Sequence, residues 1–188
     1  MVSPVRLAFA LLLLANSANA NLQLTPHETE YDLEGVKLRQ LVFFDGTQRI
    51  TYAPPRGWQY SGGGEHFVLH PSQELSAEAV IRAVNLAQPE AFNNGTMKRL
   101  AEQAIASLPG GSTHIAIISE EKNPLLIEQK ETFLIILHYE CYGMPYARSV
   151  MFLNRKNEQL IFQLTAPRPN FDKLQTQFLR SHFSWQNL

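Results

Sequence analysis

The last third of the chain, residues 131–183, constrains the fold most, because three β-rich runs there are followed at once by an amphipathic helix. The runs cover residues 131–142, 146–153 and 159–165, and short turns at 143–145 and 154–157 join them. Five apolar residues then recur at i, i+3, i+7, i+8 and i+12, namely Phe171, Leu174, Phe178, Leu179 and Phe183. A single apolar stripe of this kind is buried when the helix lies on a sheet. This part of the sequence therefore predicts a β-meander with a helix docked across it.

The first twenty residues have the pattern of an export signal. Arg6 supplies a positive start, residues 7–15 are an apolar run too short for a membrane span, and Ala18-Asn19-Ala20 is a small-x-small cleavage site. We expect cleavage after Ala20, so that the mature chain begins at Asn21 and lies in the periplasm or outside the cell. No cysteine follows the cleavage site to carry a lipid anchor, and no later run is long and apolar enough to span a bilayer.

The composition predicts one domain without a nucleic-acid partner. The 188 residues less the 20 of the signal leave 168, the size of one domain with its own core. Without Arg6 the chain holds 15 Lys and Arg against 17 Asp and Glu, a formal charge of −2 with no basic cluster of the kind that binds phosphates. Cys141 is the single cysteine, so no internal disulfide can form and stability must come from packing.

The first half of the mature chain is predicted to be mainly strand. Residues 21–35 are polar and mixed, and we expect an N-terminal arm of little order or a short helical lead-in before the domain, 36–188. Residues 36–44 and 48–52 are β-rich, and Asp45-Gly46 between them is a strong hairpin signal. A third strand begins at Trp58, residues 61–64 form a glycine loop, and residues 65–70 form a fourth strand. Residues 77–84 alternate as a strand does, although their alanines also suit a helix; strand is our prediction.

A helix over residues 94–108 divides the chain. Its apolar face consists of Met97, Leu100, Ala101, Ala104, Ile105 and Leu108. Asn94 or Thr96 can cap its start, and Pro109-Gly110-Gly111 stops it. Another strand follows at 113–119, and a short edge strand is expected at 125–128. The fold class predicted is α+β, a mostly antiparallel sheet with helices packed on it as an α/β/α sandwich.

Several of these segments resemble the PsbP-like fold family. They are the series from Ile50 to Trp58 with its Pro-x-Gly-Trp turn, Phe67-Val-Leu-His-Pro71, and Leu164-Thr-Ala-Pro167 followed by an amphipathic helix and a terminal Trp185. The family includes the extrinsic PsbP subunit of photosystem II, periplasmic DcrB-type proteins and a Ran-binding nuclear import factor. The resemblance covers residues 36–185 and implies a shared scaffold whose members act through different surfaces and are not chiefly enzymes. DcrB-type proteins are typically lipid-anchored, and this chain lacks the cysteine for that.

Two histidines are the candidates for chemistry. His66 and His70 lie four residues apart in a predicted strand, so both point to one side and could ligate zinc if a third ligand came from elsewhere. His138 and Glu140 likewise share a face of the meander, while Cys141 faces the other way. The alternative interpretation is hydrogen-bonded or solvated histidines on an open sheet face and a buried, inert cysteine. The chain has no Gly-x-Ser-x-Gly elbow, and the glycine loop lacks the Lys-Ser/Thr of a phosphate-binding loop.

The remaining candidate is a surface. Trp58, Tyr60 and Phe67 form an aromatic cluster beside the glycine loop, and such clusters bind partners or small apolar ligands when they are exposed. The competing interpretation is that Trp58 and Phe67 cap the core. The function expected is a non-catalytic exported binding or accessory module that acts through an unidentified protein partner and needs no cofactor. The alternative is a metal-dependent or hydrolytic enzyme with its site near His66 and His70.

Overall fold

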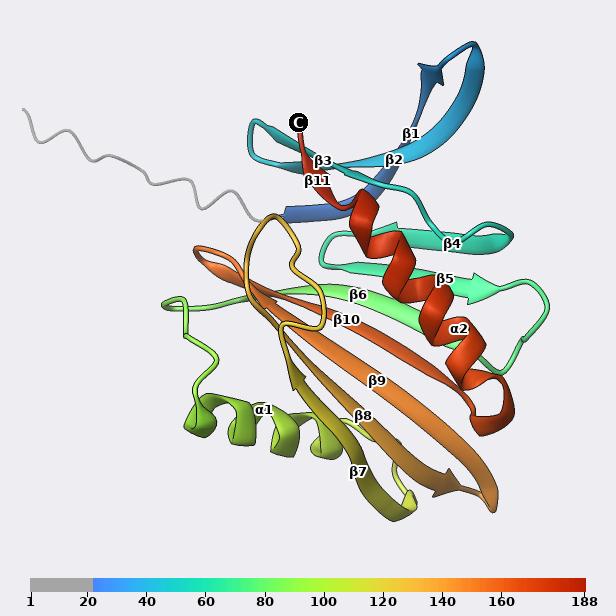
Figure 1. Cartoon of the computed structure of the whole chain (residues 1–188), viewed down its shortest axis with the longest axis vertical. Coiled ribbons are helices and arrows are strands. Elements are labelled where there is room, and N and C mark those ends of the chain that lie inside the picture. The colour runs from blue at the N-terminus through green and yellow to red at the C-terminus, as the bar shows by residue number, and fades with distance from the viewer. Residues whose placement is uncertain (1–21) are drawn as a thin grey trace, which may run out of the picture.

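A computed structural model describes residues 22–188 and arranges them as two antiparallel sheets and two helices (Figure 1). The larger sheet has the strand order β4-β5-β6-β10-β9-β8-β7 and the smaller one the order β1-β2-β3-β11. The strands of the larger sheet are β4 (Trp58–Gly63), β5 (His66–Pro71), β6 (Glu78–Asn85), β7 (Thr113–Lys122), β8 (Thr132–Cys141), β9 (Met144–Asn154) and β10 (Glu158–Pro167). Those of the smaller sheet are β1 (Leu22–Leu33), β2 (Val36–Asp45), β3 (Gln48–Tyr52) and β11 (Gln186–Asn187). The α+β class with a mostly antiparallel sheet is confirmed.

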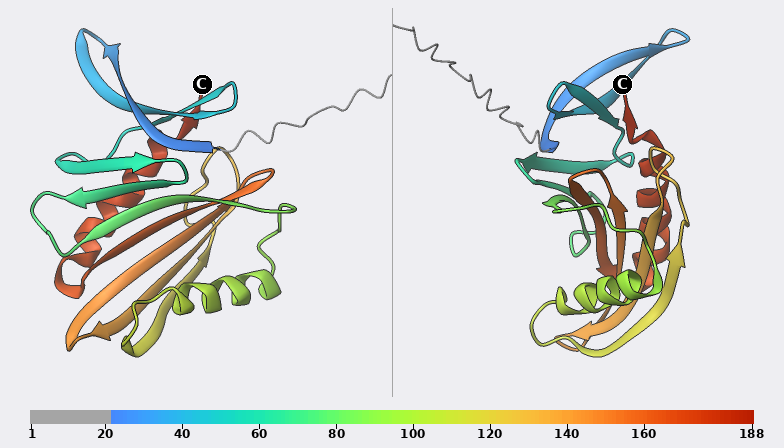
Figure 2. Two further views of the ribbon diagram at one scale, coloured as in Figure 1. Left: turned by 180° about the vertical axis from the view of Figure 1, so that it is seen from behind. Right: turned by 90° about the vertical axis from the view of Figure 1, so that its left-hand side faces the viewer.

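The two helices pack on opposite faces of the larger sheet (Figure 2). The alternation along β10 shows this, because Leu160, Phe162 and Leu164 join the core cluster that contains the buried residues of α2 (Arg168–Ser181). Ile161, between them, joins the cluster that contains the buried residues of α1 (Asn94–Ala106). Neighbouring side chains on a strand point to opposite faces, so each helix covers its own side. Among residues 22–188, no helix is long and apolar enough to cross a membrane.

Both helices differ at their ends from the sequence prediction. Asn93, rather than Asn94 or Thr96, caps α1 by accepting a hydrogen bond from the Thr96 amide at 3.0 Å. α2 begins at Arg168 without a side-chain cap and ends at Ser181. Its stripe is therefore Phe171, Leu174 and Phe178 with the half-buried Leu179, whereas Phe183 lies in a 3₁₀ turn, η1 (His182–Ser184), and is exposed. In this turn His182, and not Phe183, is the residue whose side chain is buried.

Three expectations for the strands are wrong. Residues 22–33, expected to be a poorly ordered arm or a helical lead-in, form β1 and pair with β2, with a register shift between Gln23 and His27. Residues 61–63 of the predicted glycine loop continue β4, and the turn comes only at Gly64 and Glu65. Residues 125–128 form a loop with one isolated bridge, Ile127 to Lys130. The predicted strands at 77–84 and 113–119 and the Asp45-Gly46 hairpin are confirmed as β6, β7 and the β2–β3 connection.

An aromatic cluster joins the smaller sheet to the larger one. Trp185 is fully buried, and its ring centroid lies 5.6 Å from Phe43, 5.7 Å from Tyr52 and 5.4 Å from Phe162. Just after Trp185, β11 pairs with β3, so this segment adds a strand to the smaller sheet beside the β2–β3 hairpin. From the larger sheet, Phe67 packs edge-on against Phe43, with 5.1 Å between the two ring centroids. Aromatic contacts at these separations stabilise the core beyond their buried area.

A buried cation also joins the two sheets. Arg155, in the β9–β10 turn, pairs with Asp45 of β2 at 2.8 Å and with Glu158 of β10, and its Nε lies 3.6 Å from Glu128. Burial raises the pKa of Glu158. The backbone amide of Leu22, the first described residue, donates to the same carboxylate at 3.3 Å. Four segments far apart in the sequence thus meet in one buried network around Arg155 and Glu158.

The outer half of the β1–β2 hairpin extends away from the rest of the molecule (Figure 1). Residues 28–40 will be called the arm. No residue of the arm is buried, because β3 pairs with β2 only from Leu41 onward. The arm is attached to the body by the Tyr60 hydroxyl, which donates to Glu28.

Candidate functional site: a groove beside Trp58

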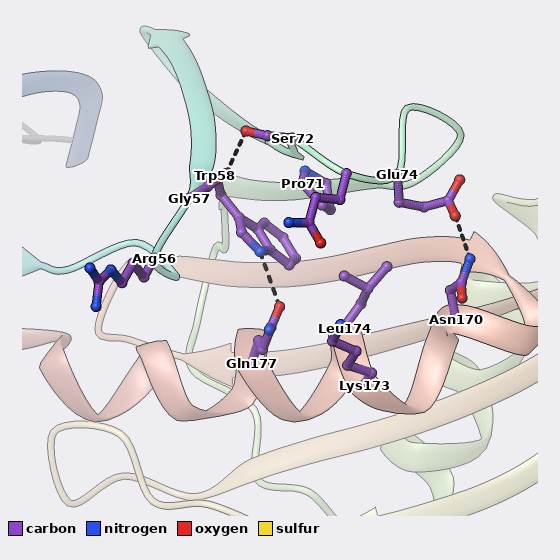
Figure 3. Close-up of a pocket in the computed structure, with 11 residues that line it drawn as sticks. Arg56, Gly57, Trp58, Pro71, Ser72, Glu74, Asn170, Lys173, Leu174 and Gln177 are labelled. Atoms are coloured by element: carbon purple, nitrogen blue, oxygen red, sulfur yellow. Dashed lines mark hydrogen bonds between the residues drawn. The ribbon is translucent and has the colours of Figure 1, made fainter.

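An open groove of about 400 Å³ lies where the start of β4 and the end of β5 meet α2 (Figure 3). Residues 56–58, residues 71–74 and four residues of α2 line it, the last being Asn170, Lys173, Leu174 and Gln177. A volume of this size is within the range of sites that bind small molecules or a few residues of a peptide. The groove is formed because the Gly57 turn and the β5–β6 loop lie on one side of it and α2 on the other.

Trp58 forms the floor of the groove. Its ring stacks on Phe178 of α2 at a centroid distance of 6.1 Å and an interplanar angle of 8°. Its Nε1 donates to Gln177 Oε1 at 3.2 Å, so the polar edge of the indole is satisfied without water. Trp58 is 8% exposed and lines the groove. The turn before it depends on Gly57, whose φ of +79° favours glycine.

The two ends of the groove differ in charge. Arg56 lies at one end and Lys173 projects from the helix along its side (Figure 3), and within residues 22–188 neither has an ion-pair partner. Glu74 lies at the other end, where it accepts hydrogen bonds from Ser76 and Asn170. The Ser76 hydroxyl is the main reason that the pKa of Glu74 is lowered. The carboxylate is thus satisfied, whereas the two cations are free to bind an anion.

The three aromatic residues predicted as a binding surface lie on one face of the β4–β5 hairpin but have different environments. Trp58 lines the groove. Tyr60 is half-buried, and its ring lies 5.8 Å from that of Phe67. Phe67 has no exposed surface and lies in the core against Phe43 and Tyr52, so it supports the hairpin and offers no contact to a partner. Phe67 therefore belongs to the core, as the competing interpretation of this cluster expected.

His66 and His70 lie on the outer face of β5, as their spacing predicted, because Phe67, Leu69 and Pro71 point inward. His70 lies 3.9 Å from Glu78 of β6, and both side chains are about half exposed. Within residues 22–188, no three His, Cys, Asp or Glu side chains are grouped closely enough to hold a metal ion. Cys141 is half-buried at the end of β8.

Arg56, Lys173 and Gln177 were missed by sequence reasoning. Arg56 follows two prolines and looks like an ordinary turn residue, and Lys173 and Gln177 occupy the polar side of an amphipathic helix. The i, i+4 spacing of Lys173 and Gln177 places them on one side of α2, and this was the only available signal. It could not indicate which loop would face them.

Comparisons with known proteins identify the fold. No protein-family model matches the chain, and no curated protein matches its sequence. Among solved structures, cyanobacterial PsbP (CyanoP) from Synechocystis sp. PCC 6803 aligns with a TM-score of 0.52 and 11% identity, over 92% of this chain and 96% of that one. The fold is PsbP-like. The expected resemblance is thereby confirmed at the level of the fold.

A second similar structure is a protein of unknown function from Pseudomonas aeruginosa, PA94, described as a putative regulator. It aligns with a TM-score of 0.44 and 18% identity, over 82% of this chain and 92% of that one. At such identities a PsbP-like fold shows the scaffold alone, because proteins that share a fold act through different surfaces. Function must therefore be argued from the residues of this chain.

Proposed function

We propose that this chain is an exported, soluble, non-catalytic accessory module, and that it binds a protein partner through the groove beside Trp58. The observation that carries the proposal is the combination of an apolar floor with two cations that have no ion-pair partner in the described chain, Arg56 and Lys173. Aromatic residues and arginines are enriched among the anchors of protein interfaces.

The occupant that fits is an extended protein segment with one apolar side chain and a nearby carboxylate. Trp58 and Leu174 would contact the apolar side chain, while Arg56 or Lys173 would pair with the carboxylate. Gln177 and Asn170 lie along the helix side and could bond to backbone groups of the segment, since an amide side chain both donates and accepts. Glu74 at the far end disfavours a second acidic group there. The groove would thus select the orientation of a bound segment as well as its composition.

Peptide binding tests this proposal. Trp58 and Trp185 are the two tryptophans, and Trp185 is 1% exposed, so a ligand in the groove should change mainly the fluorescence of Trp58. Short peptides that combine a Leu or Phe with a nearby Asp or Glu should bind more tightly than matched peptides with Lys in place of the acid. Mutating Arg56 and Lys173 together to Gln should lower the affinity for the acidic peptides at least about tenfold. A tenfold loss of affinity corresponds to ~1.4 kcal/mol of binding free energy.

Arg180→Gln provides the matched control, because Arg180 is exposed on the same helix but does not line the groove. It should leave the affinity unchanged. Equal binding of acidic and basic peptides, or an equal loss of affinity with Arg180→Gln, would contradict the proposed site.

Export is tested separately by the mass of the protein recovered outside the cytoplasm. Cleavage after Ala20 should give a chain that begins at Asn21. A product that retains residues 7–15, or recovery only with membranes, would contradict this part of the proposal.

A further inference from the structure

A second open groove, of about 450 Å³, lies between the loop that follows β7 and the segment that follows α2. Residues 126–129 line it from the loop, and residues 182–183 and 185–187 line it from the segment after the helix. It will be called the C-terminal groove. Its lining residues differ from those of the groove beside Trp58, so its role is independent of the proposed function.

Four buried polar atoms without a hydrogen-bond partner belong to residues that line the C-terminal groove. They are Glu128 Oε1, both ring nitrogens of His182 and Trp185 Nε1. The Glu128 side chain is 5% exposed, and His182 and Trp185 are 2% and 1% exposed. Among residues 22–188, one other buried side-chain atom lacks a partner, Gln175 Nε2. Because an unpaired buried polar group costs free energy, four of them around one groove are what a site for a polar molecule requires.

Glu128 is held in place by its other carboxylate oxygen. Oε2 accepts a hydrogen bond from Lys130 Nζ at 2.7 Å and lies 3.6 Å from Arg155 Nε. The backbone of Glu128 has a φ of +52°, in the left-handed region that residues other than glycine rarely adopt. Such conformations persist where the surrounding structure holds them, and they are found at binding sites. The carboxylate is therefore fixed, and its Oε1 is left for another molecule.

The unpartnered atoms determine the chemistry of that molecule. The indole N–H of Trp185 can only donate, and the carboxylate of Glu128 can only accept. Burial lowers the pKa of His182, so its neutral ring has one donor and one acceptor. An anion would be repelled by Glu128, and an ammonium group would direct its own donors at the indole donor. A hydroxyl group suits both residues, because its one oxygen donates and accepts and the group carries no charge.

The rim of the groove adds an aromatic ring. Phe183 is 65% exposed and lines the groove together with Leu126 and Gln129, which are also exposed. The face of an aromatic ring is negative, so it attracts the C–H groups on the apolar face of a sugar ring. Exposed side chains change rotamer freely, and those of the rim can therefore move aside to admit a ligand to the buried atoms.

We propose that the C-terminal groove binds a neutral sugar, whose hydroxyl groups bond to Glu128 and Trp185 and whose ring lies on Phe183. The volume of the groove is within the range of small-molecule sites, so it has room for a single sugar or the terminal residue of a longer glycan. The contacts are few, and the dissociation constant should be on the order of millimolar.

The indole N–H signals of the two tryptophans provide a direct test by nuclear magnetic resonance. Glucose, galactose and N-acetylglucosamine are titrated separately into the isotope-labelled full chain. At least one of them should shift the Trp185 signal in a saturable way, whereas the Trp58 signal should stay, because that N–H already donates to Gln177. A Trp185 signal that moves with none of the three sugars would overturn the proposal, since ordered water would then be the partner of the buried atoms.

Charged relatives of one sugar test why the ligand should be neutral. Glucosamine carries an ammonium group and glucuronate a carboxylate on the same ring as glucose. Both should bind at least about tenfold more weakly than the neutral sugar that binds best. Equal affinity for either charged sugar would refute the assignment, and so would an equal shift of the Trp185 signal by acetamide, because an amide would then fit as well as a hydroxyl group.

Two variants locate the site, with the affinity measured by magnetisation transfer from protein to sugar. Trp185→Phe keeps an aromatic ring in the core and removes the N–H, and Phe183→Ala removes the exposed ring without touching the core. Each should lower the affinity at least about fivefold. Tyr142→Ala, at a 91% exposed aromatic residue in the β8–β9 turn, is the control and should leave the affinity unchanged. Parent-like binding by Phe183→Ala, whose fold is not at risk, would contradict the proposed site.

Discussion

The buried imidazole of His182 should make the protein sensitive to acid in a way that one substitution removes. The ring lies between Phe162 and Phe178, 4.5 Å from each ring centroid, and neither of its nitrogens has a hydrogen-bond partner among residues 22–188. Burial lowers the pKa of His182 to about 3. The folded protein therefore holds this histidine neutral at pH values where the unfolded chain, with a pKa of about 6.5, binds a proton.

The sign and size of the effect follow from this difference. Above pH 6.5 both states are neutral and the full stability is present. As the pH falls from 6.5 toward 3, the unfolded state gains a proton that the folded state does not, so the free energy of unfolding decreases. The loss from this one group should be about 2 kcal/mol at pH 5 and about 3 kcal/mol at pH 4. Either value is a large share of the stability of a typical domain.

His182→Leu removes the titrating group and keeps an apolar side chain of similar size. Urea unfolding of parent and variant at pH 8, 6, 5 and 4, followed by tryptophan fluorescence, gives the difference in free energy at each pH. Other titrating groups contribute equally to parent and variant and cancel in this difference. Relative to pH 8, the free energy of unfolding of the variant should therefore exceed that of the parent by the losses given above for pH 5 and pH 4. At pH 8 it should be at least as stable, because two unsatisfied buried nitrogens are removed. His66→Leu, at an exposed position, is the control. A parent–variant difference that did not change between pH 8 and 4 would refute the argument.

Four further predictions concern packing and metal. Phe178→Ala, which removes the ring that supports Trp58 and fills the centre of the α2 stripe, should cost about 3–5 kcal/mol in chemical unfolding; parent-like unfolding would mean that α2 is not packed on the sheet. Arg155→Met should cost about 3–5 kcal/mol by the same measurement, because it leaves buried carboxylates uncompensated. Gly62→Ala should lower the melting temperature, since a Cβ there would lie 2.8 Å from a backbone oxygen of β1 and overpacking of this kind costs about 1–3 kcal/mol. Mutating His66 and His70 to Ala should leave the zinc content unchanged in elemental analysis; stoichiometric zinc that disappears would favour the metalloenzyme instead.

The strands and helices could be predicted where local pattern and packing agree. The meander from β8 to β10 and the α2 stripe follow from alternation and helical spacing, and Asp45-Gly46 fixed the β2–β3 turn. The strand β1 was missed because residues 25–33 are mostly polar or charged, and their conformation is decided by pairing with β2 rather than by burial. Phe183 was assigned to the stripe because its spacing was right, but the chain changes to a 3₁₀ turn at His182.

The candidate site was predictable only in part. Trp58 was identified from its residue type, but its contact with Phe178 of α2 depends on the topology of the whole sheet between them, which no local pattern encodes. The same holds for Arg56 and Lys173, which are ordinary surface residues until the Gly57 turn and the helix come together. Core residues can be predicted from the sequence, because burial on one face of a helix or strand requires a periodic pattern of apolar residues. Exposed side chains follow no such pattern, so the sequence does not show which of them will be neighbours.

The position of Trp185 and β11 also sets the time at which the molecule can become native. Trp185 and β11 follow every other strand in chain order, so Phe43 and Tyr52 cannot complete their contacts with Trp185 before those strands have been synthesised. Contacts between such distant segments also form slowly, because long loops must close first. The packing between the two sheets at Trp185 should therefore be one of the last parts of the fold to form.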